Sequence, residues 1–136
     1  MHFHGYDSVS FNLNNPNIQI KTFCLDQILQ EFKRQGIAYV YQPNRNYALY
    51  VNSIKELKNI QIGLTAEDGS VYIITLKPEQ YSRKLDRGYQ LLLYPTFYTN
   101  NLVIGYTALQ AYYVGFDFVT HQILIAERAD NSIHIY

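Results

Sequence analysis

Polar and apolar residues alternate along the first part of the chain. Val9, Phe11 and Leu13 share one face of an extended segment, and the residues between them are polar. Side chains of a strand point to opposite faces in turn, so this pattern predicts a strand over residues 6–13. Residues 14–17, Asn-Asn-Pro-Asn, are typical of a turn, and a second short strand is predicted directly after them.

The spacing of apolar residues then changes from alternation to a helical period, and an amphipathic helix is predicted over residues 23–35. Gly36 is expected to end this helix, and Thr22 is expected to cap its start. A further turn of helix is expected at residues 53–57. The apolar positions of the main helix recur at i, i+3, i+4 and i+7, on Leu25, Ile28, Leu29 and Phe32.

The rest of the chain favours strands. The apolar segments 60–64 and 71–74 flank an Asp-Gly dipeptide at residues 68–69, which predicts a hairpin. A parallel α/β fold would need helices between most of the strands, and the sequence offers none. We therefore expect residues 1–136 to form a single, mostly β domain with one or two short helices. Further strands are predicted at residues 37–41, 47–51, 89–94, 102–104, 112–116 and 122–126.

Composition and charge exclude several classes of partner. Lys and Arg number 11 and Asp and Glu number 11, so the clustered positive charge that binds nucleic acid is missing. No apolar run approaches the roughly 18–20 residues that span a bilayer, and residues 1–5 do not resemble a signal peptide. The compartment stays open. The single cysteine, Cys24, cannot form an internal disulfide and is expected to be a buried apolar residue.

Candidate metal ligands and nucleophiles do not cluster in the sequence. His2 and His4 would share one face of a strand, but two imidazoles do not complete a metal site. The other two histidines, His121 and His134, are distant in sequence, and no spacing pairs a histidine with the lone cysteine. The carboxylates are scattered, so no two are singled out as an acid–base pair. We expect no metal and no other cofactor.

A more specific pattern lies in the last third of the chain. Residues 102–117 contain two aliphatic residues and a glycine, then a short segment, a Tyr-Tyr pair and Phe-Asp, and residues 122–126 end on alanine. This order and spacing resemble the closing segment of pepsin-like aspartic proteases. Residues 54–64 and the Pro-x-x-Tyr turn at residues 78–81 resemble the family's hairpin and its flanks. The resemblance implies one lobe of the pepsin-like fold, the C-terminal lobe.

The same resemblance assigns roles to positions that no local pattern marks. Val51 and Tyr89 stand where two cysteines of the family form a bridge, so both partners have been lost together. The helix at residues 23–35 matches the helix that follows the second catalytic loop. Tyr106 follows Gly105 where the family usually has aspartate.

Catalysis in this family needs two carboxylates that share a proton, one from an Asp-Thr-Gly or Asp-Ser-Gly loop of each lobe. This sequence contains neither tripeptide. The nearest string begins at Asp7, which we interpret as part of the strand before the catalytic loop. That loop would then be deleted between Phe11 and Thr22. The alternative, that Asp7 is a relic of the catalytic aspartate, stays open; otherwise we predict no catalytic residue.

We therefore expect a non-catalytic, aspartic-protease-like lobe that acts as a structural or protein-binding subunit. Its partner would be another protein chain or a second lobe. The alternative is the C-terminal lobe, or a fragment, of an aspartic endopeptidase whose other lobe is a separate chain. The family's substrate pockets on this lobe match residues 94–101, so Tyr94, Phe97 and Tyr98 are expected contact residues. Tyr106 is added as an aromatic residue expected near the surface that the other lobe would cover.

Overall fold

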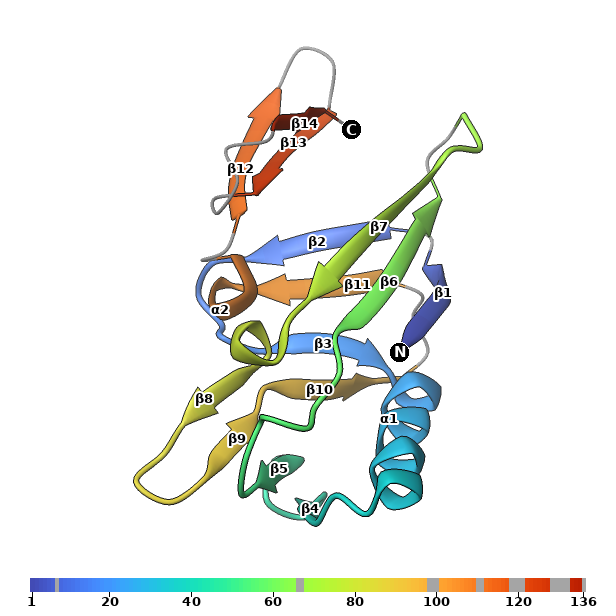
Figure 1. Ribbon diagram of the computed structural model, residues 1–136. Coiled ribbons are helices and arrows are strands. Elements are labelled where there is room, and N and C mark those ends of the chain that lie inside the picture. The colour runs from blue at the N-terminus through green and yellow to red at the C-terminus, as the bar shows by residue number, and fades with distance from the viewer. Residues whose placement is uncertain are drawn as a thin grey trace.

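The computed structural model describes residues 1–6, 8–65, 68–97, 101–109, 112–117, 122–127 and 133–135. The described parts consist mainly of strands in four small sheets, together with two α-helices and one 3-10 turn (Figure 1). The predicted mostly β architecture is therefore confirmed.

The central sheet has an unusual connection. Its strands are β2 (Ser8–Asn12), β3 (Ile18–Lys21), β10 (Leu93–Thr96) and β11 (Asn101–Gly105), in the order β10-β3-β11-β2. β2 and β3 are consecutive in the chain, but β11 lies between them, parallel to β2 and antiparallel to β3. β10 then pairs with β3 in parallel. A late segment thus separates two early strands that would otherwise be neighbours.

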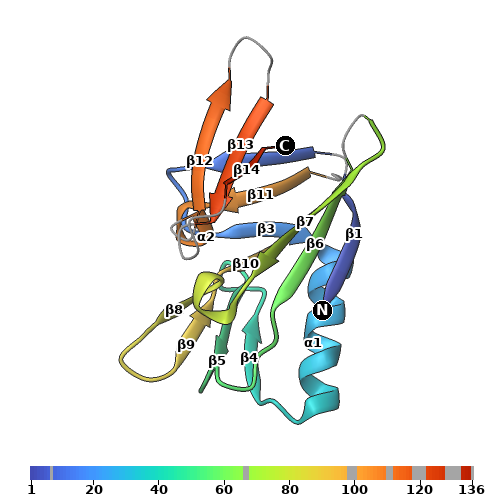
Figure 2. The same ribbon diagram turned by 45° about the horizontal axis from the view of Figure 1, so that its top comes forward.

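A three-stranded sheet crosses over the central sheet in both ribbon views (Figures 1 and 2). It contains β1 (His2–Tyr6), β6 (Ile60–Thr65) and β7 (Val71–Leu76), in the order β1-β6-β7. β6 and β7 form the predicted hairpin in regular antiparallel register. Buried aliphatic side chains from this sheet join those of the central sheet in one core, among them Ile62, Ile74, Leu102 and Ile104.

The third sheet supports the alignment with the protease family. It contains β4 (Tyr39–Gln42), β5 (Ala48–Val51), β8 (Ser82–Lys84) and β9 (Tyr89–Leu91), in the order β4-β5-β9-β8. Val51 and Tyr89 lie directly opposite each other across β5 and β9. These are the two positions that the resemblance assigns to a lost disulfide, and paired strands bring them as close together as a disulfide requires.

A fourth sheet follows near the C-terminus. It contains β12 (Tyr112–Asp117), β13 (Gln122–Glu127) and β14 (Ile133–Ile135), with β13 in the middle. The first two of these strands form an antiparallel pair at the predicted place in the chain. The short helix α2 (Tyr106–Leu109) precedes them, directly after β11.

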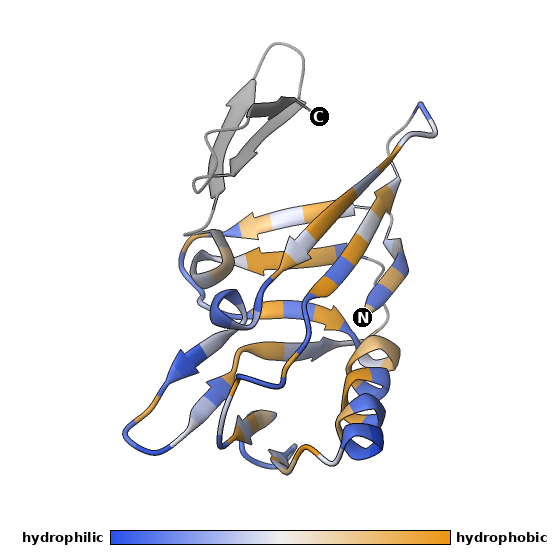
Figure 3. Ribbon diagram, in the orientation of Figure 1, coloured by the Kyte–Doolittle hydropathy of each residue, from blue (hydrophilic) through white to orange (hydrophobic). Residues whose placement is uncertain are grey.

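Helix α1 (Thr22–Gln35) buries the predicted apolar stripe, and its polar side faces outward (Figure 3). Gly36 ends it in the left-handed conformation, with φ of 73°, as expected. The predicted cap at Thr22 is wrong. Lys21 occupies the N-cap position, where no side-chain capping hydrogen bond forms, and the hydroxyl of Thr22 donates to the carbonyl of Thr96, 3.0 Å away. The tertiary contact with β10 has replaced the local one.

The helical turn predicted at residues 53–57 is also wrong. The segment is an irregular link, in which the Ser53 hydroxyl accepts the N–H of Lys55 and Leu57 N–H donates to Ile54. A side chain that satisfies a nearby backbone group competes with helix formation. The Pro-x-x-Tyr turn forms a 3-10 turn, η1 (Pro78–Gln80), followed by the fully buried Tyr81.

Candidate functional site: the link between β2 and β3

The link at residues 13–17 joins β2 to β3. The family resemblance places the catalytic loop between the strand that ends near Phe11 and helix α1, and this link lies in that interval. The structure has a short connection in this interval, with β3 after it, and the connection contains no aspartate. The deletion of the loop stays a prediction.

The end of β11 passes directly beneath this link. A Cβ atom built on Gly105 would lie 2.2 Å from the carbonyl oxygen of Asn15 and 2.4 Å from that of Asn17. It would also lie 2.6 Å from the carbonyl carbon of Pro16. These contacts are with backbone atoms, which cannot swing aside as a side chain can. Glycine is thus required here by close approach, and the next N–H, that of Tyr106, donates to the oxygen of Asn15 at 2.9 Å.

The asparagines of the link fold it locally. The side-chain oxygen of Asn12 accepts the backbone N–H of Asn14 at 3.0 Å, and that of Asn15 accepts the N–H of Asn17 at 2.9 Å. Both are turns in which the side chain takes the place of a backbone acceptor. The amide groups therefore have a structural role in shaping the link.

No carboxylate is available on the central sheet or its link. The sequence has no Asp or Glu from residue 8 to residue 25, and none from residue 87 to residue 116. These two stretches contain β2, the link, β3, β10, β11 and α2. A side-chain amide does not ionise, so it cannot share an acidic proton with a partner as a carboxyl does, and the asparagines here cannot supply an aspartic dyad. Asp7, the candidate relic, lies outside the described residues.

The outer side of the central sheet is polar and hydrogen-bonded. The hydroxyl of Ser8 donates to the side-chain oxygen of Asn101 at 2.8 Å, and the amide nitrogen of Asn101 donates to the hydroxyl of Ser10 at 3.1 Å. The bonds join β2 to β11 on the face away from the core. They position the two parallel strands and carry no charge.

A buried phenol anchors the start of helix α1. The hydroxyl of Tyr6 accepts the backbone N–H of Lys21 at 3.0 Å and donates to the sulfur of Cys24 at 3.5 Å. Burial raises the pKa of Tyr6, because the charged phenolate would lose its hydration. Cys24 is buried, as the sequence predicts. The ammonium of Lys21 lies 4.9 Å from the centre of the Tyr6 ring, an attractive cation–π contact.

Two of the four expected contact residues lie close together. Tyr94 and Phe97 both pack against Tyr47, with ring centroids 6.3 and 6.2 Å from its centroid. Tyr47 and the preceding Asn46 have positive φ angles of 56° and 57°, which is uncommon for residues other than glycine. Sequence reasoning missed Tyr47, because nothing local marks a residue that turns back toward β10. We call Tyr47, Tyr94 and Phe97 the aromatic cluster.

Tyr106 belongs to a different surface. β3 runs from the link toward α1, and Phe97 follows the residue that pairs with the far end of β3. Tyr106 lies at the near end, where its N–H contacts the link. Tyr106 is exposed, and so is Leu13 of the link; these residues directly follow Gly105 and Asn12, which pair across β11 and β2, and we call the two the link surface. Tyr98 lies outside the described residues.

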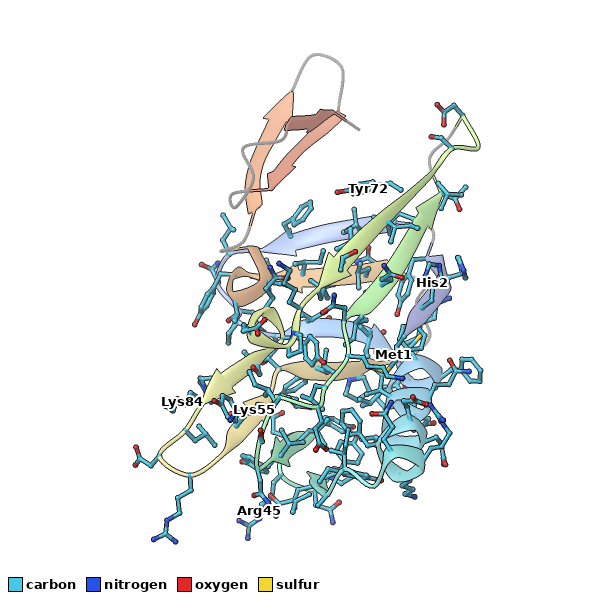
Figure 4. All side chains as sticks on the ribbon, in the orientation of Figure 1. Met1, His2, Arg45, Lys55, Tyr72 and Lys84 are labelled. Atoms are coloured by element: carbon cyan, nitrogen blue, oxygen red, sulfur yellow. The ribbon has the colours of Figure 1, made fainter. Side chains whose placement is uncertain are left out.

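The remaining candidate sites do not form clusters. The rings of His2 and His4 lie 4.3 Å apart, and His2 contacts the side chain of Gln61 at the surface (Figure 4). Among the residues that the structure describes, no group of three or more His, Cys, Asp or Glu side chains could hold a metal ion. No helix in the described ranges is long and apolar enough to cross a membrane.

Comparison with known proteins supports the fold. No protein family matches the sequence, and no curated protein sequence matches it. Among solved structures, the crystal structure of edgp is similar, with a TM-score of 0.59 and 17% sequence identity. The match covers 90% of this chain and 32% of that one, so the chain spans about a third of the protein it resembles. The fold is mostly β and corresponds to one lobe of the pepsin-like aspartic protease fold.

Proposed function

We propose that this chain is a C-terminal lobe of pepsin-like architecture that does not catalyse proteolysis and serves as a structural or protein-binding subunit. The observation that carries the proposal is the link between β2 and β3. It lies in the interval where the resemblance puts the catalytic loop, it passes close to Gly105 through backbone atoms, and its polar side chains are asparagine amides. The lack of a carboxylate in this interval supports a non-catalytic role.

Two further observations favour the C-terminal lobe. Val51 and Tyr89 face each other where the family has a bridge. β11 and Gly105 lead into a short helix and then a hairpin, in the order that the family's closing segment has. Both observations concern positions far apart in sequence, so they support the alignment independently.

The partner in this proposal is a second lobe or another protein chain. In the protease family the catalytic loop faces the other lobe, and on the alignment that the resemblance implies, the exposed Leu13 and Tyr106 of the link surface would do the same. Apolar side chains gathered at one place on a surface favour a covered interface. The aromatic cluster is a second candidate contact, since Tyr and Phe are enriched in binding sites.

The absence of catalysis is tested by a peptidase assay on an unfolded protein substrate across an acid-to-neutral pH series. We expect no cleavage above that of buffer. The Asp7→Asn variant is the matched comparison. Acid-optimal cleavage by the wild type that disappears in this variant would establish Asp7 as a working carboxylate and overturn the proposal.

The partner is tested by native mass spectrometry of the assembly purified from its natural source. We expect a heavier assembly that Leu13→Asp and Tyr106→Asp weaken, while Val40→Asp, at an exposed position on β4, leaves it intact. A partner that carries Asp-Thr-Gly and cleaves peptides with this chain would instead favour the alternative, a two-chain aspartic endopeptidase. A chain that stays monomeric in its natural source would refute the binding role.

A further inference from the structure

The open edge of β7 is a second interaction surface, separate from the link. We propose that it pairs with β7 of a second copy of this chain, antiparallel, about a two-fold axis at Tyr72 (labelled in Figure 4). The pairing would extend the β1-β6-β7 sheet across two subunits. It does not depend on the proposed function.

The backbone of β7 has one side turned toward β6 and one turned outward. The N–H of Gln61 donates to Met1 at the start of β1, so Gln61 directs its peptide groups away from β7. Direction alternates along a strand, so the neighbours of Gln61 on β6 face β7. Their partners on β7 are Tyr72, Ile74 and Leu76, and these face back toward β6.

Val71 and Ile73 therefore direct their backbone N–H and C=O groups outward. β7 is the last strand of its sheet among the strands that the structure describes. The outward groups of these two residues thus form a template for another strand.

The same two residues expose their side chains. Val71 is 59% exposed and Ile73 is 43% exposed, although both are branched aliphatic residues of a strand. Natural proteins usually protect an edge with a charge, a proline or a bulge. β7 has none of these between Val71 and Leu76, and it pairs with β6 in unbroken register. An edge of this kind favours a paired state.

The geometry favours a second copy as the occupant. In an antiparallel pair, two residues that lie opposite each other either both direct their backbone groups toward the partner strand or both direct them away. A two-fold axis at Tyr72 therefore sets Val71 opposite Ile73 of the other copy, and both of these direct their backbone groups toward the partner strand. Each such pair exchanges N–H···O bonds in both directions, and the two exposed side chains pack together. No charged residue lies in the paired segment, so no like charges meet. The start of β7 extends beyond the central sheet in both ribbon views (Figures 1 and 2).

Sedimentation velocity on the full chain, over a range of concentrations, tests the pairing. We expect a dimer that Val71→Lys and Ile73→Lys each convert to monomer, because each ammonium group would lie opposite an apolar side chain of the other copy. Val40→Lys is the matched control: Val40 is 53% exposed and lies on β4, the last strand of another sheet. Circular dichroism shows that each variant is folded. A monomeric wild type, or a dimer that both β7 variants retain, would overturn the proposal.

An engineered disulfide tests the register of the pairing. Residue 72 of one copy would lie opposite residue 72 of the other, at a distance that a disulfide can bridge, whereas residue 71 would lie opposite residue 73. Tyr72→Cys should therefore form an oxidised dimer on a non-reducing gel, and Val71→Cys should form little. Equal cross-linking of the two variants would refute the two-fold axis at Tyr72. Loss of the β7 dimer leaves the peptidase result unchanged, so failure of this inference is distinct from failure of the proposed function.

Discussion

Replacement of Gly105 by alanine tests the contact between β11 and the link. The added methyl group would lie 2.2 to 2.6 Å from three backbone atoms of the link, well inside the 3.5–4.0 Å of a normal contact. Either the link or the strand must move. Such overpacking costs roughly 1–3 kcal/mol, and the movement would also stretch the bond from Tyr106 to Asn15, worth about 1 kcal/mol. We expect a loss of about 2–4 kcal/mol, which lowers Tm by roughly 10 °C for a domain of this size.

Equilibrium unfolding in urea measures this loss, with all variants at one protein concentration because self-association would shift the result. Gly36→Ala is the matched control. Gly36 also needs glycine, with φ of 73°, but nothing lies within 4 Å of an added Cβ. Its cost should be about 1 kcal/mol, from backbone conformation alone. If Gly105→Ala proves no more destabilising than Gly36→Ala, β11 does not run beneath the link as described.

Three further predictions concern the framework. Tyr81→Phe removes the bond of a buried hydroxyl to a backbone carbonyl 2.7 Å away, and should cost about 1–2 kcal/mol in urea unfolding; an unchanged midpoint would contradict this. The double variant Val51→Cys and Tyr89→Cys should oxidise to a disulfide that closes a loop of roughly 40 residues and stabilises by at most about 4 kcal/mol; persistent free thiols would show that the two strands are not adjacent. The Arg34 guanidinium lowers the pKa of Glu31 from 4.5 to about 2, so the stabilisation that Glu31 provides over Glu31→Gln should be complete above pH 4.5 and disappear as the pH falls toward 2; a difference that stays constant over this range would contradict the assignment.

Local patterns predicted the elements of the fold well. The stripe on α1 and the Asp-Gly hairpin depend on residues a few positions apart, and both formed as expected. The predicted helix cap failed because a distant contact decided the outcome. Thr22 bonds to Thr96 on β10 and so does not cap its helix. The insertion of β11 between β2 and β3 left no local signal, because alternation in one strand says nothing about which strand lies beside it.

The candidate site was predicted only in part. The missing Asp-Thr-Gly tripeptide was visible in the sequence, but the close approach of Gly105 to the link was not, because no local pattern shows which distant strand passes the link. Tyr94 and Phe97 were expected together and are together, since they are close in sequence. Tyr106 was grouped with them and lies at the other end of β3, because the chain reverses direction between β10 and β11.

The position of β11 also sets the order in which the chain can acquire its structure during synthesis. β2 and β3 are made early, but the strand that separates them comes from residues 101–105, after some three quarters of the chain has emerged. Until then neither strand has its native neighbour on that side, and contacts between such distant segments form slowly. Nascent chains should therefore expose these strand edges for most of translation, which makes them candidates for chaperone binding at that stage. The glycine that lets β11 pass beneath the link would be needed last, when the sheet closes.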